Sequence, residues 1–108
     1  MNAWEILDAV SERKRRGKSY YEFFRDSSLS LGIYGLSAGE GDPQQPHTED
    51  EVYYIVRGSG RMRIGDQDRA VTPGSVVFVG AGAEHRFHSI EEDLEVLVVF
   101  APSEGSRA

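Results

Sequence analysis

The chain has 108 residues, of which 39% are hydrophobic, 28% are charged and 12 are glycine, as expected for one globular domain with a single core and many turns. It has no cysteine, which excludes disulfides, thiolate catalysis, iron–sulfur clusters and cysteine-rich zinc sites, so any metal must be held by nitrogen and oxygen. The formal net charge of −6 argues against a nucleic-acid partner, and no apolar run has the length of a membrane span, so we expect a cytoplasmic protein whose partner is a small molecule.

Residues 1–18 are expected to form an N-terminal unit with one amphipathic helix, over residues 3–16, that packs on a larger body. Four apolar residues recur at three- and four-residue spacing: Trp4, Ile6, Leu7 and Val10. The pattern ends at Gly17, a residue type that commonly follows the last turn of a helix. The basic residues 13–16 are interpreted as a solvent-exposed last turn that the helix dipole favours.

Residues 19–102 are expected to form a β-barrel or sandwich. Eight short apolar runs are separated by turn residues: YYEFF, LSLGIYGL, EVYYIV, RMRI, RAV, SVVFV, HRFHSI and LEVLVVFA. Three of the connections are interpreted as tight turns between antiparallel strands: residues 57–60, 65–67 and 72–74. The small and polar residues 103–108 are expected to be a flexible tail.

Alternation within EVYYIV assigns the faces of that strand. If Glu51 points inward, so do Tyr53 and Ile55, while Tyr54 and the two valines face the other way. Both faces are then apolar, which is typical of a barrel strand covered on its outer side by a helix, a second sheet or a partner subunit.

Two of the three histidines stand at strand openings together with a carboxylate. His47 and Glu51 lie four residues apart where EVYYIV begins, and His85 opens another strand after a glycine-rich loop. Two imidazoles and one carboxylate from separate strands form the set that leaves positions open on a divalent metal. Gln45 lies on the same side of an extended chain as His47 and offers a carbonyl oxygen as a fourth ligand.

These segments resemble the two sequence motifs of the small single-domain cupins. The first reads Gly39, five residues, Gln45, one residue, His47, three residues, Glu51, six residues and Gly58; the second reads Gly74, five residues, Gly80-Ala81-Gly82, two residues, His85, three residues and Ser89. Gln45 replaces the usual first histidine, Gly80 a proline and Ser89 an asparagine. The resemblance covers residues 29–101.

The resemblance implies a mainly β fold, the cupin double-stranded β-helix or jelly-roll barrel, with one N-terminal α-helix. It also implies one divalent metal ion (Zn, Fe, Mn, Ni or Co) bound by Gln45, His47, Glu51 and His85. The amide at Gln45 would shift the site toward metals that tolerate oxygen ligands. In the alternative, Gln45 faces solvent and the other three residues form a buried polar network without metal.

Three aromatic residues are expected to border the substrate pocket: Tyr34, Tyr53 and Phe87. Tyr53, next to Glu51 on the inward face, is a candidate proton donor, although all three rings are also suited to filling a barrel. His88 lies three residues beyond His85 and is expected on the outer face. Glu49 and Asp50 are interpreted as a solvated bend.

Two functions follow from the pattern. The first is a metal-dependent enzyme of the dioxygenase, isomerase or lyase type that acts on a small oxygen-rich molecule, because the ligand set leaves coordination positions open. The alternative is a non-catalytic binding or sensor protein, because the inward faces offer no lysine and no pair of carboxylates for acid–base work. A homodimer is expected under either function.

Overall fold

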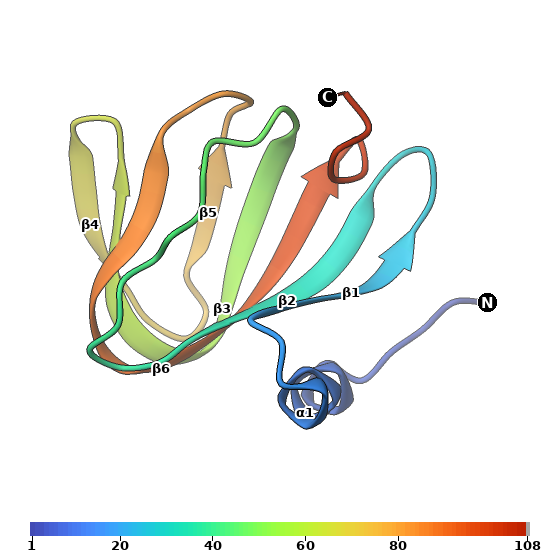
Figure 1. Cartoon of the computed structure of the whole chain (residues 1–108), viewed down its shortest axis with the longest axis horizontal. Coiled ribbons are helices and arrows are strands. Elements are labelled where there is room, and N and C mark those ends of the chain that lie inside the picture. The colour runs from blue at the N-terminus through green and yellow to red at the C-terminus, as the bar shows by residue number, and fades with distance from the viewer. Residues whose placement is uncertain (108) are drawn as a thin grey trace.

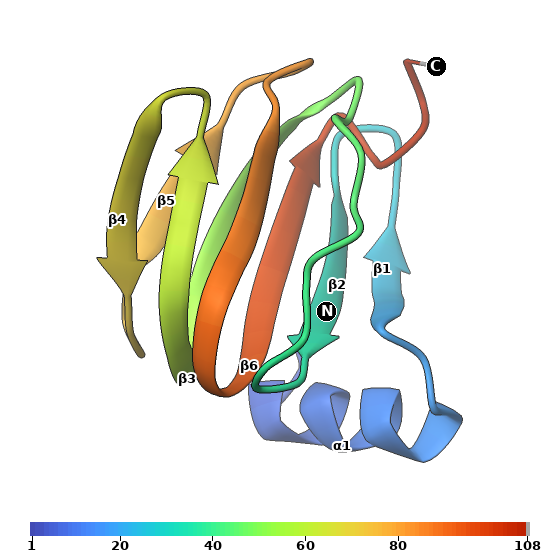
Figure 2. The ribbon, with the colours of Figure 1, turned by 60° about the vertical axis from the view of Figure 1, so that its left-hand side comes forward.

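In the computed structural model, which describes residues 1–107, one helix precedes six antiparallel strands that curve into a barrel (Figure 1). The elements are α1 (Ile6–Arg16), β1 (Tyr20–Arg25), β2 (Ser30–Leu36), β3 (Asp50–Ile64), β4 (Gln67–Val71), β5 (Val76–Val79) and β6 (His85–Ala101). The strands pair in the order β1-β2-β6-β3-β4, and β5 pairs with β3. The predicted mainly β fold with an N-terminal helix is confirmed. Residues 37–49, between β2 and β3, run across the open side of the curved sheet (Figure 2).

Two long strands replace four of the shorter strands expected from the sequence. β3 continues through the glycines at 58 and 60, so the prediction of a tight turn there was wrong. Gly58 has a φ of 92°, and a Cβ at this position would lie 2.1 Å from the carbonyl oxygen of Asp93. The β3–β6 register shifts between Ile55 and Arg61. Gly58 is therefore required at a β-bulge, where the backbones of β3 and β6 are in close contact, and not at a turn that reverses the chain.

The other two expected turns are present. Gly65, with a φ of 58°, lies between β3 and β4. Gly74, with a φ of 94°, precedes Ser75, whose N–H donates to the carbonyl of Thr72 at 2.9 Å. A positive φ at the third residue of a turn that begins with threonine and proline is the geometry of a type II turn.

The barrel interior is filled by the inward residues of the long strands. Tyr53, Ile55 and Phe87 are at most 1% exposed, while Tyr54 on the outward side of β3 is 42% exposed. The faces predicted for β3 are therefore correct. Each buried side chain of this size stabilises the fold by roughly 1.5–3 kcal/mol.

Helix α1 covers the outside of β1 and β2. Ala9 and Val10 pack on Ile33, and this small cluster is separate from the barrel core. The helix begins at Ile6 and not near Ala3, and Trp4 instead lies 5.3 Å from Phe23 between ring centroids. Gly17 ends the helix in the left-handed conformation, as predicted.

Arg13 does not belong to a solvated basic cluster. Its guanidinium donates two hydrogen bonds to the carboxylate of Glu95 on β6, at 2.9 and 2.7 Å, and the two side chains are 14% and 4% exposed. Gly35 leaves the space for this contact, since a Cβ there would lie 2.2 Å from Arg13 Cζ. The prediction that residues 13–16 are all solvated was therefore wrong for Arg13, which ties α1 to the barrel.

Candidate metal centre

The fold brings together three of the four residues predicted to bind metal. His47 lies just before β3, Glu51 is the second residue of β3, and His85 is the first residue of β6. One nitrogen or oxygen atom of each lies within 4.8 Å of the other two. Glu51 and His85 are buried and His47 is half-buried, so a ligand reaches the cluster from the side of His47.

His85 is oriented so that one ring nitrogen points at a carboxylate. Its Nδ1 lies 2.8 Å from the carbonyl oxygen of Ala83, which only accepts, so Nδ1 carries a hydrogen. Its Nε2 lies 2.8 Å from Glu51 Oε1. Burial lowers the pKa of His85, but the contacts with Glu51 and Ala83 outweigh this effect and raise it. A neutral His85 would direct a lone pair at Glu51, so the site favours a cation between the two groups, either a proton or a metal.

The carboxylate of Glu51 is otherwise without partners. The residue is 1% exposed, and apart from the ion-pair contact with His85, neither oxygen receives a hydrogen bond from residues 1–107. A buried carboxylate in this state is costly unless it is paired or coordinates a metal. Two imidazoles and this carboxylate therefore fit a divalent metal ion.

The amide that accompanies the histidines belongs to Gln44. Its Oε1 accepts a hydrogen bond from the Tyr53 hydroxyl at 2.9 Å and lies 3.3 Å from Nε2 of both His47 and His85. Gln45 is exposed. The structure thus places Gln44, and not the predicted Gln45, beside the cluster.

Asp42 holds Gln44 in place. Its carboxylate accepts hydrogen bonds from the backbone N–H and the side-chain amide of Gln44, at 3.2 and 2.6 Å. It also accepts from the Phe87 N–H at 2.9 Å and the Tyr34 hydroxyl at 2.6 Å. Asp42 therefore joins the loop of residues 37–49 to β2 and β6 through hydrogen bonds. The Asp-Pro step at 42–43 is the only sequence signal that could have indicated this role.

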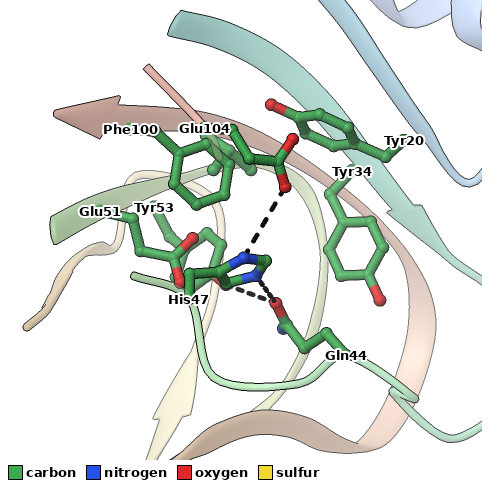
Figure 3. A pocket seen from close by; sticks show the side chains of 9 residues that line it. Tyr20, Tyr34, Gln44, His47, Glu51, Tyr53, Phe100 and Glu104 are labelled. Atoms are coloured by element: carbon green, nitrogen blue, oxygen red, sulfur yellow. Dashed lines mark hydrogen bonds and ion pairs between the residues drawn. The ribbon is translucent and has the colours of Figure 1, made fainter. Parts of the chain in front are cut away.

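A cavity of about 140 Å³ opens beside the cluster (Figure 3). Of the three aromatic residues expected at the substrate pocket, Tyr34 and Tyr53 line this cavity, while Phe87 lies behind Tyr53 with 5.0 Å between ring centroids. The Tyr53 hydroxyl lies 3.0 Å from His85 Nε2, and burial raises the pKa of this phenol. Tyr53 is therefore a neutral hydroxyl at the edge of the site.

The C-terminal segment forms one side of the cavity through Glu104, which the sequence did not indicate. Glu104 lines the cavity, and its Oε2 lies 3.7 Å from His47 Nδ1. Glu49 is 2% exposed and accepts hydrogen bonds from the N–H groups of Gly105 and Arg107, at 2.8 and 3.2 Å. The interpretation of Glu49 as solvated was wrong, because residues 103–107 fold back over it.

His88 lies away from the cluster, as predicted. It is on the outer side of β6, and its Nε2 is 2.6 Å from Asp68 Oδ2. Asp50, at the start of β3, accepts a hydrogen bond from the Ala81 N–H at 2.8 Å and so fixes the loop before His85.

Comparisons with known proteins agree on the fold. Residues 32–100 match the family of cupin domains. An uncharacterised protein of Streptomyces coelicolor is 44% identical over 104 residues, which make up 96% of this chain and 99% of that protein. Acireductone dioxygenase 3 of Arabidopsis thaliana is 31% identical over 85 residues, which cover 74% of this chain and 43% of that enzyme. The solved structure of the DMSP lyase DddQ from Ruegeria pomeroyi has a TM-score of 0.70 at 25% identity and matches 76% of this chain.

The chain spans less than half the length of the two named enzymes, 43% of the dioxygenase and 45% of the lyase. Within residues 1–107, no helix has the length and apolarity required to cross a membrane.

Proposed function

This chain belongs to the cupin domain family, and we propose that it binds one divalent metal ion through His47, Glu51 and His85. Its strands form the double-stranded β-helix of that family. The observation that supports this most directly is the buried Glu51 carboxylate, which has no partner among residues 1–107 other than His85 Nε2 at 2.8 Å. The ion is Zn, Fe, Mn, Ni or Co, because imidazole and carboxylate together suit these metals.

We propose that Gln44, and not Gln45, supplies the fourth protein donor. Gln44 Oε1 is already 3.3 Å from both histidines, and its side-chain N–H group is bound to Asp42, which leaves the oxygen facing the cluster. Gln44→Ala is expected to weaken metal binding about 10–100-fold, the range found when groups that support a metal site are removed. Gln45→Ala is the matched control and is expected to leave the affinity unchanged; equal loss in both variants would contradict the assignment.

We propose that the protein is an enzyme that acts on a small oxygen-rich organic molecule, in a reaction of the dioxygenase, isomerase or lyase type. Relatives that match this chain are named as a dioxygenase and a lyase, which supports these classes. The metal, when bound, would supply a Lewis acid or a redox centre to substrate oxygens. Tyr53 would hold a proton at its hydroxyl beside His85, and Gln44 accepts that hydroxyl's hydrogen bond and so orients it.

Elemental analysis of the purified protein, followed by turnover assays on ene-diols and diketones with and without dioxygen, tests this function. Metal at one ion per chain together with turnover that His47→Ala abolishes is the expected result. A saturated metal site with ligands that bind and are recovered unchanged would instead identify a binding or sensor protein. A protein that takes up no metal would contradict the proposal altogether.

We also propose that the chain forms a homodimer through the outer face of β3 and β5. Val76 and Phe78 are 66% and 63% exposed, and Tyr54 is opposite Val76 in the sheet. Large exposed apolar residues that adjoin one another on a sheet mark an interaction surface.

A further inference from the structure

We propose that Tyr20 and Glu104 form a ligand-binding subsite at the end of the cavity away from Gln44, and that this subsite selects an uncharged, hydroxyl-bearing ligand over a carboxylate or phosphate. The inference rests on the proposed function, since it assigns the class of molecule that the metal centre would act on. Figure 3 shows both residues across the cavity from Gln44.

A ligand of about six non-hydrogen atoms would fill the cavity. Its volume is about 140 Å³. An engineered apolar cavity of roughly 150 Å³ in another protein holds one benzene molecule. The walls beside the subsite are Val98 and Phe100, which suit a short carbon skeleton.

The charges around the cavity disfavour an anion. Glu51 and Glu104 line it, and none of the residues within 1–107 that line it is a lysine or an arginine. Burial raises the pKa of Glu104, and when both carboxylates are ionised their charges offset those of a divalent ion. The cavity then offers no net positive charge to a carboxylate or phosphate. Like charges placed together in a binding site are strongly unfavourable, and this is a common source of specificity.

Tyr20 supplies an unused hydrogen-bonding group. Its hydroxyl is buried and has no hydrogen-bond partner among residues 1–107. Its ring lies directly over Gly32, where a Cβ would be 2.2 Å from the hydroxyl oxygen. Burial raises the pKa of Tyr20, so the hydroxyl keeps its proton. A buried polar group of this kind is costly to leave unpaired, and a ligand oxygen in the cavity would satisfy it.

Glu104 is held at the cavity by its backbone. Its N–H donates to Ser30 Oγ at 3.0 Å, and the next N–H, of Gly105, donates to the buried Glu49 at 2.8 Å. Its carboxylate contacts His47 Nδ1 at 3.7 Å, too far for a strong hydrogen bond. The carboxylate therefore remains free to accept a hydrogen bond from a ligand hydroxyl, which a ligand carboxylate cannot donate.

Isothermal titration calorimetry with two probes tests the subsite. Dihydroxyacetone is uncharged and lactate is an anion with the same number of non-hydrogen atoms. The measured quantity is the ratio of the two dissociation constants, compared between the wild type and Glu104→Gln. Chelation of the metal contributes equally to both proteins, so it cancels in this comparison. Glu104→Gln is expected to shift the ratio toward lactate by about tenfold. The exposed Glu91→Gln is the control and is expected to leave the ratio unchanged.

Tyr20→Phe provides the second measurement. It is expected to weaken dihydroxyacetone binding about fivefold through the loss of one hydrogen bond. Its neighbour on the opposite face, Tyr21→Phe, is expected to have no effect. An unchanged ratio in Glu104→Gln, or no measurable binding of dihydroxyacetone to the wild type, would overturn the subsite.

The metal content of every sample is measured first, so that failure of the two proposals can be told apart. If the wild type takes up no metal, the proposed function fails. The same titrations on the metal-free protein then still decide the subsite, since Glu51 and Glu104 line the cavity in either form.

Discussion

Glu51→Gln is predicted to remove the stabilisation that metal binding provides while leaving the metal-free protein nearly as stable as the wild type. The substitution keeps the size of a side chain that is 1% exposed and removes only its charge. Within the described residues 1–107 of the metal-free protein, His85 is the one partner of that charge. Burial lowers the pKa of His85 and Glu51 raises it, so His85 is expected to lose its proton once residue 51 is neutral. No unpaired charge is then left buried, and the expected change is within about 1 kcal/mol.

The effect in the presence of metal follows from linkage. A ligand that binds only the folded state at 100 times its dissociation constant raises the free energy of unfolding by about 2.7 kcal/mol. For a domain of this size, each kcal/mol changes the melting temperature by roughly 4 °C, so saturating metal is expected to raise it by about 10 °C. Glu51→Gln should lose nearly all of this increase.

Thermal unfolding followed by circular dichroism, with metal and with a chelator, measures both quantities. His47→Ala should behave similarly, and His88→Ala, which alters a histidine outside the cluster, should keep the full increase. Retention of the increase in Glu51→Gln would show that this residue is not a ligand. A loss of more than about 3 kcal/mol in the metal-free protein would instead identify a structural polar network that needs no metal.

Three further predictions concern the parts of the fold that surround the site. Gly35→Ala is expected to destabilise the protein by roughly 3–5 kcal/mol in urea denaturation, because a Cβ would lie 2.2 Å from Arg13 Cζ and would separate this residue from the buried Glu95; unchanged stability would refute the contact. Burial raises the pKa of Glu49, but hydrogen bonds from a neighbouring threonine and from the C-terminal backbone outweigh it and lower the pKa below 4.5. The stabilisation from Glu49 is therefore complete above pH 4.5 and is lost as the pH falls through the pKa of Glu49 in the folded protein. Hydrogen-exchange protection of the C-terminal turn should decline over that acid range. Constant protection would contradict this role of Glu49. Phe78→Glu on the exposed sheet face is expected to convert a dimer to a monomer in light scattering; a wild type that is already monomeric would contradict the dimer.

The predictable part of the structure depends on local patterns. The inward positions of Tyr53 and Ile55 follow from the alternation of a strand, and the turn at Gly74 follows from its proline and glycine. The spacing of the two motifs is sufficient to group His47, Glu51 and His85 from the sequence alone. Each of these features is encoded within a few residues.

The parts that were mispredicted depend on contacts between distant segments. Gly58 has the composition of a turn, and only the approach of Asp93 from β6 shows it to be a bend within a strand. Gln44 and Gln45 are chemically identical neighbours, and the choice between them depends on Asp42. Glu104 lies in a polar segment without periodicity, and Glu49, 56 residues before the glycine it binds, holds that segment at the cavity.

The position of the C-terminal turn determines how the purified protein should be handled. Glu104 lies 3.7 Å from His47, only a few residues before the end of the described chain, while the N-terminus emerges on the side of α1 (Figure 1). Extra imidazoles joined to this turn, as in a polyhistidine tag, would lie close to the cavity and would compete for the same ion. Affinity constants and metal contents are therefore best measured on protein tagged at the N-terminus, or after the tag has been cleaved.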